Sequence, residues 1–94
     1  MKLVWTAQAV ADLVEIADYV SEHHPDAAIA LRDRLRSVIE GLVDFPMAGR
    51  PGRVAETREL VVPGSNYLVP YRVHEGRVEI LAIVHAARDW PESF

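Results

Sequence analysis

Two segments rich in apolar residues, 67–74 and 77–85, are separated only by a Glu-Gly dipeptide at 75–76. Glycine adopts positive φ without steric cost, so a two-residue turn that contains it favours a tight hairpin and fixes which residues pair. In that register Arg72 lies opposite Glu79, and one face of the hairpin is uniformly apolar. The sequence therefore predicts an antiparallel strand pair that packs one face against a core.

The second face of this hairpin mixes apolar and charged side chains. It carries Arg72 and Glu79 and, at its end, His85, beside leucine and isoleucine residues. Such a mixture is typical neither of a core nor of a fully solvated surface, so we expect this face to be open and to meet another molecule. A cross-strand ion pair between Arg72 and Glu79, and a His85 ring that bonds a backbone carbonyl, are the plain structural alternatives.

Helical periodicity characterises the first half of the chain. Apolar residues recur at helical spacing within 7–22, and the stripe consists of Val10, Leu13, Val14, Ala17 and Val20. A second stripe follows from residue 28 to 42, after a break that ends at Pro25, a residue suited to the first turn of a helix. We therefore expect two antiparallel helices joined by a short turn.

Short strands flank this helical hairpin, at 2–5 on one side and at 57–62 on the other, the latter after an irregular loop at 47–56. The predicted order is β-α-α-β-β-β. This order indicates an α+β fold, with a helical hairpin packed on one face of a small, mainly antiparallel four-stranded sheet. We expect a single domain spanning 1–94.

Charge is unevenly distributed along the chain. The net charge is −4, and all of it falls within residues 1–45, which hold eight acidic residues against four cations. An acidic balance disfavours non-specific nucleic-acid binding, which depends on phosphate neutralisation. The chain has no cysteine, which excludes disulfides and cysteine-based zinc sites, and no leader or membrane-spanning segment is visible. We expect a cytoplasmic protein without cofactor or metal.

Several short motifs, in this order and spacing, resemble the RelE/ParE superfamily of toxins from bacterial type II toxin–antitoxin modules. The motifs are Trp5-Thr6, Phe45-Pro46 with Gly49-Arg50, Thr57-Arg58-Glu59-Leu60, Tyr71-Arg72-Val73, and the run from Val84 to Pro91. The resemblance covers nearly the whole chain. It implies a cognate antitoxin whose disordered tail wraps the toxin, and therefore a hetero-oligomer.

The resemblance implies two kinds of target. ParE-like members bind DNA gyrase without known catalysis, whereas RelE-like members are ribosome-dependent endoribonucleases that cut mRNA. Catalysis would need acid, base and cationic groups, for which the candidates are Arg58, Arg72, His85 and Arg88. We favour gyrase binding, because the middle of the chain lacks lysine and Phe94 stands where several such enzymes carry tyrosine. An interaction module without toxicity is a third possibility.

The arginines of the loop and of the strand after it are the candidate antitoxin-binding residues. Arg50, Arg53 and Arg58 are expected to contact carboxylates of the antitoxin, because bidentate arginine–carboxylate contacts combine charge with geometry. Arg58 could instead fix the loop. We also expect an antitoxin helix in a groove on the helical hairpin.

Overall fold

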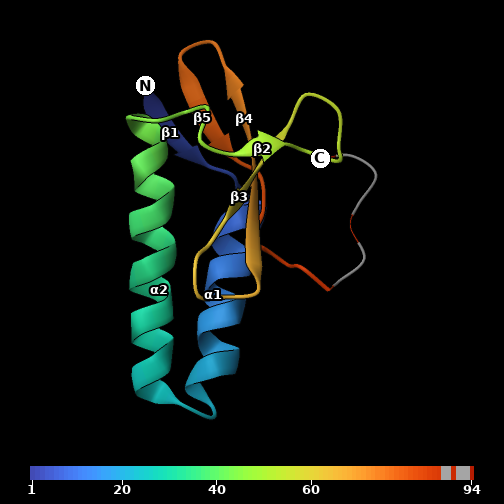
Figure 1. The fold of residues 1–94 in the computed structure, drawn as a ribbon. Coiled ribbons are helices and arrows are strands. Elements are labelled where there is room, and N and C mark those ends of the chain that lie inside the picture. The colour runs from blue at the N-terminus through green and yellow to red at the C-terminus, as the bar shows by residue number, and fades with distance from the viewer. Residues whose placement is uncertain (88–89, 91–93) are drawn as a thin grey trace.

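The computed structural model describes residues 1–87, 90 and 94, and Figure 1 shows the arrangement of the elements. No helix in these described ranges is long and apolar enough to cross a membrane. The elements, in chain order, are β1 (Lys2–Trp5), α1 (Ala7–Ser21), α2 (Pro25–Glu40), the short 3₁₀ helix η1 (Gly41–Val43), β2 (Arg50–Pro51), β3 (Arg58–Val61), β4 (Tyr67–His74), β5 (Arg77–Ile80) and β6 (Val84–His85).

The strands form one mixed sheet in the order β1-β5-β4-β3-β2, with β6 paired to β4 beyond the end of β5. β1 runs parallel to β5, and all the other neighbours are antiparallel. In Figure 1, α1 and α2 lie side by side along the sheet. The predicted α+β class is confirmed. The predicted four strands are too few, because the two-residue strand β2 is added and the predicted strand at 77–85 is divided into β5 and β6.

Thr6 fixes where α1 begins. Its hydroxyl accepts the Ala9 backbone N–H at 3.2 Å, which satisfies one of the free donors at the helix start and makes Thr6 the N-cap. The same hydroxyl donates to the Ile80 carbonyl at 2.8 Å, so the cap also joins the helix to β5. At the other end of α1 the chain reverses over residues 22–24, and Pro25 opens α2.

The core lies between the helices and the adjacent face of the sheet. Its buried members are Ala9, Leu35, Ile39, Leu42, Val62, Val69, Tyr71, Val78, Ile80 and Ile83. The predicted stripe of α2 is confirmed through Leu35 and Ile39. The predicted stripe of α1 is partly wrong, because the side chains of Val10 and Val14 are 47% and 55% exposed while Ala9 packs into the core.

The turn between β4 and β5 has the predicted form. Glu75 and Gly76 both adopt positive φ, at 50° and 74°, which is the conformation that a tight two-residue hairpin turn requires. The register near the turn is also as predicted, with Arg72 opposite Glu79.

Farther from the turn the register shifts by one residue. Two residues of β4, at 69–70, lie opposite three residues of the facing chain, at 81–83, so Tyr67 pairs with His85. An extra residue reverses the alternation of side chains, as in a β-bulge. His85 therefore lies on the same face as Tyr67, and the prediction that it shares a face with Arg72 is wrong. The physical cause is at Ile83, whose N–H donates to the Asp12 carboxylate at 3.0 Å rather than to β4.

Candidate functional site

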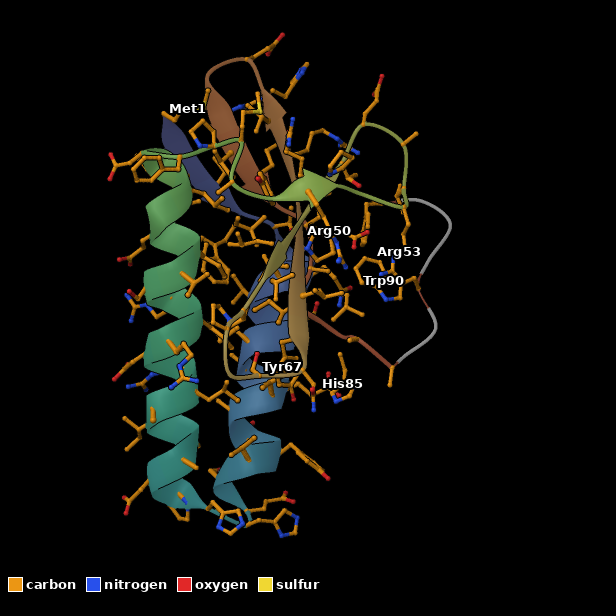
Figure 2. All side chains as sticks on the ribbon, viewed as in Figure 1. Met1, Arg50, Arg53, Tyr67, His85 and Trp90 are labelled. Carbon is orange, nitrogen blue, oxygen red and sulfur yellow. The ribbon has the colours of Figure 1, made fainter. Side chains whose placement is uncertain are left out.

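A buried carboxylate organises the predicted antitoxin-binding loop. The Glu59 side chain is only 3% exposed, and the β2–β3 register places it opposite Arg50. It accepts the Arg53 backbone N–H at 2.8 Å, the Arg53 Nε at 3.1 Å and the Arg50 Nη2 at 3.3 Å. Figure 2 shows both arginines on the side of the sheet away from α2. Arg50 and Arg53 are thus brought together, with 57% and 46% of their side chains still exposed.

Two opposing effects act on the pKa of Glu59. Burial alone would raise the pKa of this carboxyl, because a buried charge loses its hydration. The hydrogen bonds and positive charge of Arg53, together with the hydrogen bond from Arg50, outweigh burial and lower the pKa below its ordinary value of 4.5. The ionised form of Glu59 is therefore the one that the fold stabilises.

This lowered pKa predicts how stability responds to acid. A carboxyl whose pKa is lower in the folded chain stabilises the fold above the unfolded pKa, and that contribution is lost as pH falls through the folded pKa. We expect Glu59→Gln to lower the free energy of unfolding by about 1–2 kcal/mol at neutral pH. Urea unfolding from about pH 7 to about pH 3 should show this difference from wild type shrinking in acid.

The exposed Glu56, whose side chain has no hydrogen bond to other described residues, offers the matched control for that measurement. Glu56→Gln should change the free energy of unfolding by less than about 0.5 kcal/mol at every pH. If the loss of unfolding free energy in Glu59→Gln stayed constant down to low pH, it would contradict an ionised Glu59 bonded to Arg50 and Arg53.

The sheet face that carries Arg72 is not open at its centre, which corrects the sequence prediction. Pro70 has the same parity in β4 and is fully buried, and Val54 of the loop is also buried. The Arg53 guanidinium lies 3.8 Å from the centre of the Trp90 ring, so the loop contacts Trp90 on this side (Figure 2). An arginine over an indole is a cation–π contact, worth about 0.5–1 kcal/mol when exposed.

Arg58 lies on the opposite face of the sheet, toward the helices. It pairs with Tyr71 across β3 and β4, and its Nη1 donates to the Gly49 carbonyl at 2.8 Å. The Tyr71 hydroxyl accepts the Gly49 N–H and donates to the Pro46 carbonyl, each at 2.8 Å. Burial raises the pKa of Tyr71, and the Gly49 hydrogen bond and the Arg58 charge oppose this rise. Arg58 and Tyr71 thus hold the start of the loop.

The other candidate catalytic residues do not lie with Arg58 and Tyr71 at the start of the loop. Arg72 pairs with Glu79 in register, but the two side chains form no ion pair with each other, and Arg72 Nε is buried without a partner among the described residues. Arg88 lies outside the described residues. Roles for Arg58, Arg72, His85 and Arg88 in catalysis therefore stay predictions.

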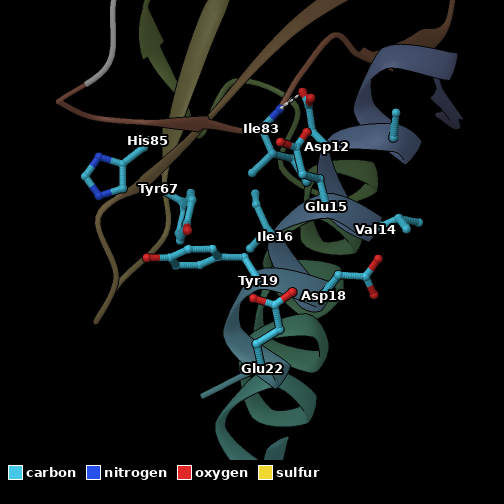
Figure 3. Close-up of a pocket in the computed structure, with 11 residues that line it drawn as sticks. Asp12, Val14, Glu15, Ile16, Asp18, Tyr19, Glu22, Tyr67, Ile83 and His85 are labelled. Carbon is cyan, nitrogen blue, oxygen red and sulfur yellow. Dashed lines mark hydrogen bonds between the residues drawn. The ribbon is translucent and has the colours of Figure 1, made fainter. Parts of the chain in front are cut away.

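His85 lines an open groove beside α1, which we call the α1 groove. Its volume is ≈ 910 Å³, and its lining residues are Ala11, Asp12, Val14, Glu15, Ile16, Asp18, Tyr19, Glu22, Tyr67, Ile83 and His85. The Tyr67 and His85 rings meet edge to face, with their centres 5.5 Å apart. Figure 3 shows Tyr19 beneath Tyr67, with the carboxylates of α1 around them.

Two residues that sequence reasoning missed hold these sites in place, namely Glu59 and Asp12. Glu59 had a signal, because it sits at a strand position between Arg58 and Leu60 and follows two loop arginines at short spacing. No local sequence pattern indicated the role of Asp12, because its hydrogen bond to Ile83 spans 71 positions of sequence. Tyr71, a buried member of the core, also positions the loop through its hydroxyl.

Known proteins that are similar to this chain are named as toxins. The family described as the ParE toxin of the type II toxin–antitoxin system parDE matches residues 3–90. Two relatives are a protein named as a candidate toxin, Y4kP of Sinorhizobium fredii, and Toxin RelE2 of Caulobacter vibrioides. The first is 40% identical over 91 residues, covering 97% of this chain and 94% of the relative, and the second is 41% identical over 87 residues, covering 93% and 97%.

A solved structure agrees as well. A chain of the chromosomal ParDE toxin–antitoxin system of P. aeruginosa superposes with a TM-score of 0.83 at 31% identity, covering 90% of this chain and 95% of that one. The fold and these matches define the toxin component of a type II toxin–antitoxin module. The chain belongs to the ParE toxin family, within the RelE/ParE superfamily. Its expected partner is therefore an antitoxin.

Proposed function

We propose that this toxin inhibits growth by binding DNA gyrase in the cytoplasm, and that it does not cut mRNA. The observation that carries the proposal is the separation of the groups that RNA cleavage would need. His85 pairs with Tyr67 and Arg58 pairs with Tyr71, four positions apart along β4 and thus roughly 13 Å. Arg72 alternates to the other face of the same strand.

General acid–base cleavage needs its groups within reach of one phosphate. Candidate acids and bases act at hydrogen-bond distance from the reacting atoms, and cations must contact the same transition state. His85 faces the carboxylates of α1, which disfavour a phosphate there, and Arg58 is bonded to Gly49. These described side chains therefore fit a binding protein better than a ribonuclease.

Two assays with purified toxin distinguish gyrase binding from mRNA cleavage. The first measures DNA supercoiling by gyrase with increasing toxin, and the second measures mRNA integrity by primer extension during cell-free translation. We expect inhibited supercoiling and intact message. Codon-linked cleavage of the message with unaffected gyrase would assign the ribonuclease activity instead, and an effect in neither assay would indicate an interaction module without toxicity.

The His85→Ala variant tests the proposal inside cells. We expect growth inhibition within about two-fold of wild type, because the His85 ring makes an edge contact with Tyr67 that is worth only about 0.5–1.5 kcal/mol. The exposed His74 provides the control, as His74→Ala removes an imidazole at the far end of β4. Complete loss of toxicity in His85→Ala, with His74→Ala and the fold unaffected, would make His85 a catalytic residue.

A further inference from the structure

The α1 groove is apolar at its floor and acidic at its rim. Ile16 and Ile83 lie at the base, and the ring of Tyr19, 65% exposed, lies beside Tyr67 (Figure 3). The carboxylates of the rim come from Asp12, Glu15, Asp18 and Glu22, and no lysine or arginine is among the lining residues. Much of the negative charge of the first half of the sequence is thus concentrated at one concave surface.

Only some of these carboxylates form hydrogen bonds within the fold. Asp12 accepts the Ile83 N–H and the Gln8 side-chain amide, at 3.0 and 2.7 Å. Glu15 and Glu22 are exposed, and neither side chain has a hydrogen bond or ion pair with another described residue. Two carboxylates beside an exposed aromatic ring are therefore available to a partner.

We propose that the α1 groove binds a basic segment of the antitoxin, with an arginine or lysine whose stem lies along Tyr19 and whose charge meets Glu15 and Glu22. Long cationic side chains bury their methylene stems on apolar surface and keep the charge at the edge, and aromatic faces attract cations. The rim charge fits a cationic protein segment and opposes nucleic acid. The proposal rests on the toxin function proposed above and adds a recognition surface separate from Arg50 and Arg53.

The antitoxin is the occupant that best fits the exposure of this groove. Tyr19 and Val14 are large apolar side chains that stay more than half exposed in the free chain. Covering such side chains stabilises a lasting complex, and an antitoxin is the lasting partner of this family. An antitoxin that also reaches Arg50 and Arg53 would need an acidic segment there, so its tail should carry segments of opposite charge.

The test compares two doubly neutralised toxins that lose the same charge. Glu15→Gln with Glu22→Gln removes the free carboxylates of the groove, and Asp33→Asn with Glu40→Gln removes two exposed acids of α2. Calorimetry measures the Kd of each full-length toxin for the protein encoded by the adjacent open reading frame. We expect the groove variant to bind about 10-fold more weakly at about 50 mM salt and the α2 variant to stay within about two-fold. The difference should shrink at about 500 mM salt.

Two outcomes would overturn the proposal. Equal Kd values for the two variants would show that the groove does not contact the antitoxin. Overlapping synthetic peptides of the antitoxin, titrated against isotope-labelled toxin, should shift Tyr19 and Tyr67 resonances only when they are basic, so a shift caused by acidic peptides alone would also contradict it.

Growth assays separate this proposal from the proposed function. If the groove variant binds antitoxin normally but no longer inhibits growth, the groove belongs to the target and the inference is wrong while the toxin function stands. If wild-type toxin has no effect on gyrase or growth, the proposed function fails, yet the Kd comparison still decides the occupant of the groove.

Discussion

Replacing Gly49 with alanine is expected to lower the free energy of unfolding by about 3 kcal/mol. A Cβ at this position would lie 2.5 Å from Tyr71 Cε1, 2.7 Å from the Tyr71 hydroxyl and 3.0 Å from the Glu59 carbonyl oxygen. The Tyr71 ring is fully buried, and its hydroxyl is bonded to Gly49 of the loop and to Pro46 just before the loop. The ring cannot move away without breaking those bonds, so the loop itself must shift.

Thermal unfolding measures this effect, with Gly41→Ala as the matched control. A Cβ at Gly41 would meet no atom within 4 Å, and the residue has helical φ and ψ at the end of α2. Gly41→Ala should therefore be neutral or stabilising by about 0.5–1 kcal/mol. For a domain of this size, a loss of 3 kcal/mol corresponds to a fall in Tm of about 12–24 °C. A Gly49→Ala protein that unfolds at the wild-type temperature would show that the loop is not held against Tyr71.

The same loop illustrates how far sequence reasoning extends. Turn chemistry and helical periodicity are local properties, so the Glu75–Gly76 hairpin, the break before Pro25 and the α+β class followed from short stretches of sequence. The irregular loop was recognised from its two glycines, one proline and two arginines. Its attachment to Tyr71 depends on hydrogen bonds between the Tyr71 hydroxyl and backbone groups 22 and 25 positions away, which no local pattern encodes.

The error over His85 has a specific physical origin. Alternation along a strand predicts the face of a side chain only while the register is constant, and one extra residue reverses it. That residue is accommodated between Ile80 and Val84 because Asp12 of α1 satisfies the Ile83 N–H. A bond between elements so distant in sequence could not be foreseen, and it moved His85 from the predicted partner-facing surface into the α1 groove.

Truncating Arg50 or Arg53 to alanine is expected to weaken antitoxin binding by at least about 10-fold. Each guanidinium donates to Glu59, and each arginine side chain remains about half exposed, so each can also donate to a carboxylate of a partner. Removing a cation from such a contact leaves the antitoxin carboxylate desolvated and unpaired. Calorimetric Kd values and unfolding free energies of the same variants should be measured together.

Stability separates a binding role from a purely internal one. Arg50 contacts Glu59 through one 3.3 Å bond, so Arg50→Ala should cost less than about 1 kcal/mol of folding free energy. Arg53 makes two side-chain bonds to Glu59 and lies over Trp90, so Arg53→Ala should cost about 1–2 kcal/mol. Arg36 of α2, an exposed cation, provides the control for lost positive charge. A contact to the antitoxin would change the Kd even where folding is unaffected. If Arg50→Ala and Arg53→Ala bind antitoxin as tightly as Arg36→Ala does, the loop arginines serve only to hold Glu59 within the fold.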